Sequence, residues 1–237
     1  MFDHVGIRVS DQDASARFYQ TVLSTLGIEQ TYKGEQLVEW DEFCIGDDGP
    51  VTSGLHVGFR AAGHAEVDAF WQAGIDAGYQ DDGAPGPRPQ YVKDYYGAFL
   101  LDPDGNSVEA VWHGKMRGGM IDHLWLRVAD VDASQRFYET IAPHAGLEVR
   151  RLAPDHVQCL GAKATFSMLA GTPTENLHIA FPTDDDADVQ AFHRAGVDAG
   201  YRDNGGPGER PNYHPGYYGA FVLDPDGTNV EVVNHHR

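Results

Sequence analysis

Two short stretches of the chain alternate between apolar side chains and polar or small ones. In residues 2–9 (FDHVGIRV) the apolar members share one face of an extended strand, namely Val5, Ile7 and Val9. The opposite face carries His4 beside a glycine and an arginine. Residues 55–60 (LHVGFR) repeat the pattern, with His56 on the polar face. Each stretch predicts a strand that packs one face on helices and turns a small, polar face toward a cavity.

Helical periodicity follows each of these strands. Ser10 precedes an acidic first turn and predicts the N-cap of a helix that stops at Gly27. The apolar stripe of this helix consists of Phe18, Tyr19, Val22, Leu23 and Leu26. A second helix is predicted from Ala65 to Ala77, with Gly78 as its stop. Its inner side consists of Val67, Phe70, Trp71 and Ile75.

The remaining segments of this half predict short strands and turns. Three strands are expected between the two helices, near residues 29–33, 36–40 and 42–45. After the second helix comes a Gly/Pro-rich stretch that we interpret as a loop. The chain then predicts strands at Tyr95–Leu101 and Val108–Trp112, joined by the Asp-Pro-Asp-Gly turn that begins at Asp102.

The whole pattern occurs twice. Residues 79–109 recur as residues 201–231 at an offset of 122, and residues 1–20 recur as residues 120–139 at an offset of 119. Such self-similarity decides the architecture before any local signal does. We therefore expect two domains, at 1–113 and 120–237, joined by a polar, Gly-rich linker at 114–119.

Charge and cysteine content restrict the partners. The formal net charge is −19, from 17 basic and 36 acidic residues, which opposes binding to nucleic acid or to an anionic membrane. No apolar run approaches the ~20 residues of a membrane span, and no secretory signal opens the chain. Cys44 and Cys159 are isolated, which makes neither a disulfide framework nor a cysteine-based metal cluster. We expect a cytoplasmic protein that acts on a small molecule.

Three strands of each half carry a residue of metal-ligand type on the face opposite the apolar one. These residues are His4, His56 and Glu109 in the first half, and His123, His178 and Glu231 in the second. Any one of them alone would more often be an ordinary strand residue. The matched set in both halves predicts instead one two-histidine, one-carboxylate metal site in each half, with positions left open for substrate or water.

The motifs that carry these residues resemble the vicinal-oxygen-chelate superfamily of glyoxalases, extradiol dioxygenases, epimerases and fosfomycin- and bleomycin-resistance proteins. The likeness lies in the openings DHVGIRV and DHLWLRV, the strands LHVGF and LHIAF, and the endings YYGAF-x-LDPDG-x-x-VE, and it covers nearly the whole chain, twice. It implies an α+β fold in which four βαβββ modules pair into two curled, incompletely closed eight-stranded sheets with helices outside. It also implies metal ligands at the six positions named above.

The loop before the tyrosine pair in each half offers further candidates. Arg88 and Arg210 are predicted to bind an anionic substrate, and so is the hydroxyl of Tyr96. His214 and Tyr218 are predicted catalytic residues, His214 because the resemblance places a histidine there. In the first half Val92 replaces that histidine. The first tyrosine of each pair, Tyr95 and Tyr217, is assigned to the core.

Three functions remain open at this point. The first is an enzyme in which Fe, Mn, Ni or Zn holds two neighbouring oxygens of a small substrate, for lyase or isomerase chemistry or for ring-cleaving dioxygenation. The second is a protein that sequesters an antibiotic or metabolite in the same cavity. The third is a pseudo-dimer with one or both sites idle. Because one chain already holds four modules, we expect a monomer or a homodimer.

Overall fold

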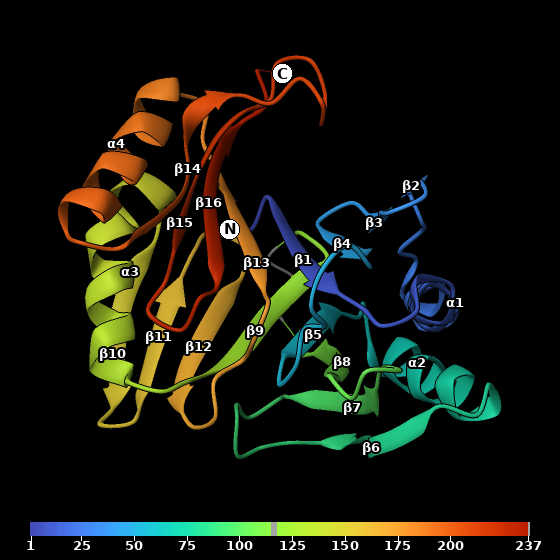
Figure 1. Ribbon diagram of the computed structural model, residues 1–237. Coiled ribbons are helices and arrows are strands. Elements are labelled where there is room, and N and C mark those ends of the chain that lie inside the picture. Colours follow the sequence, from blue (N-terminus) through green and yellow to red (C-terminus); the bar gives the residue numbers. More distant parts are fainter. Residues whose placement is uncertain (115–117, 237) are drawn as a thin grey trace. The chain divides into compact units, whose positions relative to one another are not determined.

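A computed structural model of the chain describes residues 1–114 and 118–236 (Figure 1). The linker predicted at 114–119 thus lies partly outside the described residues. The chain forms two compact units. The boundaries between them fall within strands β1 (His4–Arg8) and β9 (Ile121–Val128). We call Gly6–Trp125 the continuous unit, and Met1–Val5 together with Leu126–Arg237 the split unit. The first five residues therefore belong to the same unit as most of the second half.

The continuous unit contains two helices and the strands between and after them. Its elements, besides parts of β1 and β9, are α1 (Gln12–Leu23), a 3-10 turn (Ser24–Leu26), β2 (Tyr32–Lys33), β3 (Val38–Trp40), β4 (Phe43–Gly46), β5 (His56–Arg60), α2 (His64–Asp76), β6 (Gln80–Pro87), β7 (Tyr96–Leu101) and β8 (Ser107–Trp112).

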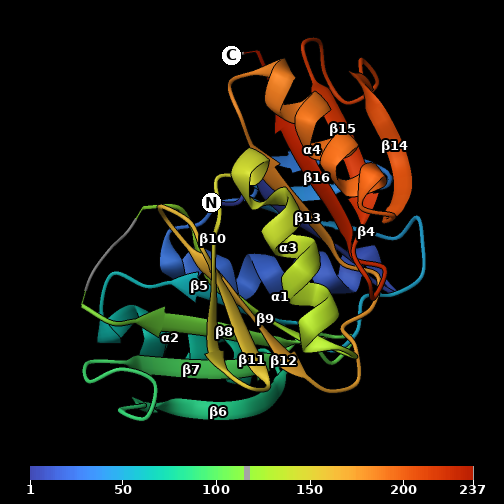
Figure 2. The same ribbon diagram turned by 90° about the vertical axis from the view of Figure 1, so that its left-hand side faces the viewer.

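The split unit repeats this order. Its elements are α3 (Val131–Ala145), β10 (Glu148–Ala153), β11 (His156–Leu160), β12 (Thr165–Ala170), β13 (His178–Pro182), α4 (Asp186–Asp198), β14 (Arg202–Glu209), β15 (Tyr218–Leu223) and β16 (Asn229–Asn234). In this unit α3 and α4 pack on each other, and α4 covers β14, β15 and β16 (Figure 2).

Within residues 1–114 and 118–236 the strands form two mixed, eight-stranded sheets, neither of them closed into a barrel. Their hydrogen-bonded orders are β14-β15-β16-β13-β1-β4-β3-β2 and β10-β11-β12-β9-β5-β8-β7-β6. The pairs β5–β8 and β13–β16 are parallel. The α+β class and the four βαβββ modules predicted from the sequence are confirmed. Each sheet, however, combines one module from each half of the sequence.

The helices form where the periodicity predicts them, with one shift at the start. Asp11, rather than Ser10, is the N-cap of α1, and its carboxylate accepts a hydrogen bond from the backbone N–H of Ala14. The predicted apolar stripe of α1 is buried. On α2 the buried apolar residues are Val67 and Phe70, which face β6, β7 and β8. Within the described ranges no helix is long and apolar enough to cross a membrane.

The Gly/Pro-rich stretch that we interpreted as a loop is in large part a strand. β6 pairs with β7 in antiparallel register, with shifts on both sides of Gly83. Gly83 has a φ of +154°, and a Cβ atom there would lie 2.9 Å from the ring of Phe99. Glycine therefore allows the strand to bulge against that ring. The edge position of β6 in its sheet also tolerates the prolines, which cannot donate to a neighbouring strand.

Candidate metal centre

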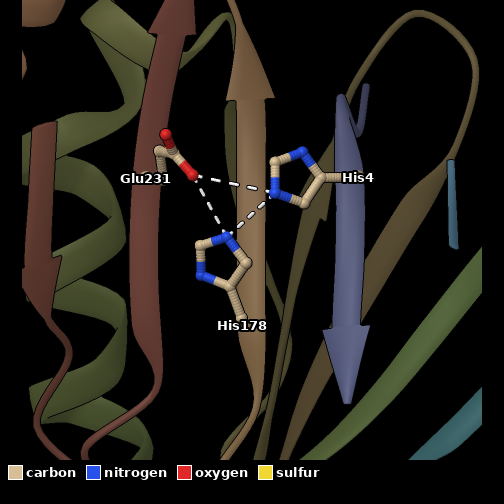
Figure 3. Close-up of side chains that lie close together, drawn as sticks. All are labelled: His4, His178 and Glu231. Atoms are coloured by element: carbon tan, nitrogen blue, oxygen red, sulfur yellow. Dashed lines mark hydrogen bonds and ion pairs between the residues drawn. The ribbon is translucent and has the colours of Figure 1, made fainter. Parts of the chain in front are cut away.

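Three side chains of the split unit point toward one another from neighbouring strands (Figure 3). They are His4 on β1, His178 on β13 and Glu231 on β16, and we call them the first triad. The Nε2 atoms of the two histidines are 3.0 Å apart. Oε2 of Glu231 lies 3.1 Å from Nε2 of His178 and 3.7 Å from Nε2 of His4.

The continuous unit holds an equivalent group, which we call the second triad. It consists of His56 on β5, Glu109 on β8 and His123 on β9. The two Nε2 atoms are 3.2 Å apart. Oε2 of Glu109 lies 3.1 Å from Nε2 of His56 and 3.2 Å from Nε2 of His123. Gly58 faces His123 across the β5–β9 pair, and a Cβ atom on it would lie 2.5 Å from the imidazole carbon Cε1. The absence of a side chain at Gly58 therefore makes room for the third ligand.

The structure brings all six predicted ligands into triads but corrects how they are grouped. We expected one site per half of the sequence. Instead, His4 of the first half joins two ligands of the second half, and His123 of the second half joins two ligands of the first. The reason is the sheet order. β1 lies beside β13, and β9 lies beside β5, so the first strand of each half contributes its histidine to the other half's pair.

The outer nitrogen of each imidazole contacts a hydrogen-bond acceptor. Nδ1 of His4 lies 2.8 Å from a carboxylate oxygen of Asp3, and Nδ1 of His123 lies 3.0 Å from one of Asp122. Nδ1 of His178 lies 2.8 Å from the side-chain nitrogen Nδ2 of Asn229, a donor, and 3.1 Å from the backbone oxygen of the same residue, an acceptor. At His4 and His123 the aspartate keeps a proton on Nδ1, so Nε2 is the nitrogen that is available to a metal ion.

The fourth imidazole reaches the same state through a hydroxyl. Nδ1 of His56 lies 3.0 Å from Oγ of Ser107. That hydroxyl donates its proton to a carboxylate oxygen of Asp82 at 2.7 Å. Ser107 therefore accepts from His56, which keeps a proton on Nδ1 and leaves Nε2 as the nitrogen that faces the triad.

Both glutamates are almost completely buried, at 1% exposure, and both are held by a tyrosine. The hydroxyl of Tyr95 donates to Oε1 of Glu109 at 2.8 Å, and that of Tyr217 donates to Oε1 of Glu231 at 2.6 Å. Burial, followed by the charge and hydrogen bond of the carboxylate, raises the pKa of both tyrosines. Each hydroxyl therefore stays protonated and occupies one carboxylate oxygen, which leaves Oε2 for the triad.

The donor set fits a divalent metal ion. Within each triad two Nε2 atoms and one carboxylate oxygen lie 3.0 to 3.7 Å from one another. In the first triad Oε2 of Glu231 is buried and has no hydrogen bond of acceptable geometry to any described residue. A buried carboxylate oxygen without a hydrogen bond costs free energy unless another interaction compensates the loss. Two imidazoles and one carboxylate are ligands that first-row divalent metals accept.

The electrostatics of the second triad show how strongly its members interact. Burial raises the pKa of the Glu109 carboxyl, but hydrogen bonds from the two histidines outweigh burial and hold it below its usual value. Burial lowers the pKa of His123, but hydrogen bonds with Asp122 and Glu109 outweigh burial and raise it to about 9. A metal ion entering this triad must therefore displace a proton from His123.

Outside each triad the aspartate that contacts a ligand histidine has further partners. Asp3 contacts His235, whose Nε2 lies 3.0 and 2.9 Å from the two carboxylate oxygens. Nδ1 of His235 in turn lies 2.7 Å from Nε2 of His214. The predicted catalytic residue His214 is thus connected to His4 through two intervening side chains, and it does not contact the triad directly in the described hydrogen bonds.

The predicted substrate-binding arginines lie one aromatic ring away from the triads. Arg210 donates to the backbone oxygens of Glu209 and Gly206, and its guanidinium lies 5.5 Å from the ring centre of Phe221. Phe221 contacts His178. In the other half Arg88 makes the corresponding contacts: it donates to backbone oxygens and lies over the ring of Phe99, which contacts His56. Both arginines brace the Gly/Pro-rich strands, and their role in substrate binding stays a prediction.

The assignment of the tyrosine pairs needs correction. The hydroxyl of Tyr96 donates to Asp68 on α2, and the hydroxyl of Tyr218 accepts from Gln190 on α4. Both side chains therefore lie on the helix side of the sheet, away from the triads. Their neighbours Tyr95 and Tyr217 are buried, as predicted for core residues, and their hydroxyls also reach the glutamates. Adjacent residues of a strand point to opposite faces, so the second tyrosine of each pair points away from the triad that the first one contacts.

Several residues around the triads were not singled out from the sequence, although a signal for them exists. An aspartate precedes the first ligand histidine in both halves, as Asp3 and as Asp122. His113 and His235 also recur at the offset of 122, and His113 contacts Asp122 at 2.9 Å as His235 contacts Asp3. The repeat that revealed the triad residues thus also marks the residues that contact them. Arg60 and His214 are matched by residues of another kind, Pro182 and Val92.

The fold and the two triads define a protein of four βαβββ modules with two candidate metal centres. The chain belongs to the Glyoxalase/Bleomycin resistance protein/Dioxygenase superfamily, because the sequence model of that family matches residues 1–110 and 120–232. This confirms the resemblance found in the motifs. Among curated proteins, none matches the chain significantly.

Two solved structures show the same fold over nearly the whole chain. Glyoxalase I from Zea mays is 20% identical, with a TM-score of 0.72 and coverage of 99% of this chain and 92% of that one. A protein from Bacillus subtilis subsp. subtilis str. 168, described as a putative dioxygenase, is 14% identical, with a TM-score of 0.68 and coverage of 100% and 85%. A glyoxalase/bleomycin resistance protein from Albidiferax ferrireducens T118 is 35% identical over 47% of this chain and 98% of its own, with a TM-score of 0.44.

Proposed function

We propose that the protein is a metal-dependent enzyme that binds a small substrate through two neighbouring oxygen atoms at its triads. The observation that carries this proposal is the pair of triads, in each of which three ligand atoms lie within 4.8 Å of one another. Three protein ligands leave positions open for substrate oxygens. Membership of a superfamily that includes glyoxalases and dioxygenases supports an enzyme over a structural pseudo-dimer.

A bound divalent ion would act as a Lewis acid that stabilises negative charge developing on a substrate oxygen. The protein's own residues prepare the site for it. Tyr95 and Tyr217 hold the glutamates in one orientation, and Asp3 and Asp122 fix the rings of two ligand histidines. Because these partners are buried or partly buried, the ligands are positioned before the metal or the substrate arrives.

Two reaction classes fit this arrangement. Two histidines and one carboxylate with open positions are typical of Fe(II) enzymes that use oxygen, which favours ring-cleaving dioxygenation. The other class is isomerase or lyase chemistry, which moves a proton between adjacent carbon atoms. In that case we propose His214 as the residue that holds the proton at its imidazole, with His235 fixing its ring. Fe, Mn, Ni and Zn all accept these ligands.

The experiment that tests the proposal separates the two classes. Chelator-treated protein is reloaded with Fe(II) in the absence of oxygen. It is then mixed with air-saturated buffer that contains a panel of catechols, and oxygen uptake is followed. The same protein loaded with Ni(II), Zn(II) or Mn(II) is offered adducts of 2-oxoaldehydes with thiols, and their absorbance is followed. The double variant E109Q/E231Q serves as the control and should be inactive in both arms.

Two results would overturn the proposal. One is a protein that takes up none of these ions. The other is tight binding of a bleomycin-type antibiotic by the metal-stripped protein with no turnover in either arm. That result would support the alternative function of sequestering an antibiotic or metabolite.

A further inference from the structure

The two triads differ in what contacts the aspartate behind a ligand histidine. Behind the first triad, Asp3 contacts His235, which contacts His214. Behind the second triad, Asp122 contacts His113, and Nε of Arg60 lies 3.2 Å from its carboxylate. At the offset of 122 the residue that corresponds to Arg60 is Pro182, so the first triad has no cation at that position.

Arg60 is held as a buried charge. Its side chain is 4% exposed, and its guanidinium donates to the backbone oxygens of Gly118 and Gly119. A guanidinium stays protonated at any pH at which the protein is folded. Because solvent does not reach this group, the field of its charge is poorly screened at the second triad.

The charge on Arg60 acts on a metal ion in two ways, and both weaken its binding to the second triad. It repels a cation held by the second triad. It also draws the negative charge of Asp122 toward itself, and Asp122 is the residue that supports the basicity of His123. Asp3, the carboxylate behind the first triad, has no such permanent cation among its described contacts.

We infer that Arg60 lowers the affinity of the second triad for divalent cations, so that the first triad fills first when metal is scarce. This inference rests on the proposed function, since it presupposes that both triads bind metal. It makes the two sites of one chain unequal and names the residue responsible.

An opposing charge must be weighed. Asp82 reaches His56 through Ser107 and adds negative charge near the second triad. Its counterparts in the other half are neutral, because Asn204 contacts Asn229 there. Asp82 is exposed, however, and solvent and salt screen an exposed charge far more than a buried one. The buried guanidinium therefore dominates.

The test measures each triad alone. E109Q removes the carboxylate from the second triad and leaves the first intact, and E231Q does the reverse. Glutamine keeps an oxygen that can accept the tyrosine hydroxyl, so both variants preserve that hydrogen bond. Mn(II) is titrated into each chelator-treated, full-length variant, and the free ion is counted by electron paramagnetic resonance. We expect E109Q to bind Mn(II) roughly tenfold more tightly than E231Q or better.

A second set of variants assigns the difference to Arg60. In the E231Q background, R60Q should tighten Mn(II) binding severalfold, R60K should leave it nearly unchanged because the charge stays, and D82N should change it less than twofold. In the E109Q background R60Q should have no effect. If R60Q does not fold, the comparison of E109Q with E231Q still tests whether the first triad binds Mn(II) more tightly than the second, because it needs no change at Arg60.

The outcomes separate the inference from the proposed function. Equal affinities of the two single-triad proteins overturn the inference and leave the function standing. So does a weaker rather than tighter site in E231Q/R60Q, or a D82N effect as large as that of R60Q. If the unmodified protein binds neither Mn(II) nor Zn(II), the proposed function itself fails.

Discussion

Tyr217 donates its hydroxyl proton to Glu231 over 2.6 Å, and both side chains are buried. We expect Tyr217→Phe to lower metal affinity at the first triad about 10-fold or more, because the carboxylate loses the bond that orients it. It should also lower the free energy of unfolding by ~1–3 kcal/mol, since a buried oxygen loses its donor. Calorimetric metal titration and urea unfolding measure the two effects.

Tyr218→Phe is the matched control for this prediction. Its hydroxyl contacts Gln190 on α4 at the protein surface, on the other side of the sheet. It should change unfolding by less than ~0.5 kcal/mol and leave metal affinity as it was. Equal losses of affinity in the two variants would show that the tyrosine–carboxylate bond has no special role.

A second prediction concerns metal content. The chain should bind two divalent ions, one per triad, and His56→Ala combined with His178→Ala should abolish binding because it removes one ligand from each triad. Each single variant should keep one ion. Removing the metal should lower the melting temperature by mass action. Elemental analysis of protein purified without chelators measures the content, and full metal content in the double variant would contradict the assignment.

A third prediction concerns the close approach of β5 and β9. Gly58→Ala places a methyl group 2.5 Å from the ring of His123, so the ring must shift and the second triad should lose its ion. Alanine already occupies the corresponding position of the other half, as Ala180, so the first triad should keep its ion. The variant should therefore bind one ion per chain. Retention of two ions would mean that the sheet relaxes without moving the histidine.

A fourth prediction is a pH dependence of the metal-free protein. The pKa of His123 in the folded protein, about 9, lies above its usual 6.5. Its protonation therefore stabilises the fold fully below pH 6.5, and this contribution is lost as the pH rises through 9. The melting temperature of chelator-treated protein should fall over this range, and His123→Asn should flatten the fall. An equally steep fall in the variant would assign it to other groups.

The last prediction compares activity at the two triads. Glu231→Ala should lower kcat more than Glu109→Ala, with His214→Ala close behind Glu231→Ala. A histidine linked to the first triad can pass a proton, whereas Val92 at the matching position cannot, and a general base contributes ~10²–10⁴-fold in rate. Steady-state kinetics at equal amounts of folded protein measure this. A larger loss from Glu109→Ala would reverse the assignment.

The sequence repeat was enough to predict the modules and the six residues that meet in the two triads, because matched side chains recur at a nearly fixed offset. It was not enough to group the ligands. Whether His4 joins His56 or His178 depends on which strands lie side by side, and that pairing is set by contacts between residues far apart in the chain. Hydrophobic periodicity carries no record of such contacts.

The prediction that Tyr96 and Tyr218 face the site was wrong for a local reason. Both Tyr95 and Tyr96 are aromatic, so the alternation of polar and apolar residues gives no phase at the start of β7. Gly97 carries the information that the two tyrosines lack, namely which face of the strand lies against the glutamate. A Cβ atom there would lie 2.4 Å from Oε1 of Glu109, so the face that Gly97 shares with Tyr95 is the one against the carboxylate. A glycine in a strand, read as a close approach, would have assigned the two tyrosines correctly.

The exchange of first strands also sets an order of completion during synthesis. The residues of the second triad all lie between His56 and His123, so a ribosome that has passed His123 has made every one of them. His4 precedes all of them, yet its partner His178 is 174 residues later than His4, and Glu231 is later still. The first triad can therefore close only after the second is fully made, and a chain terminated before His178 would carry at most the second.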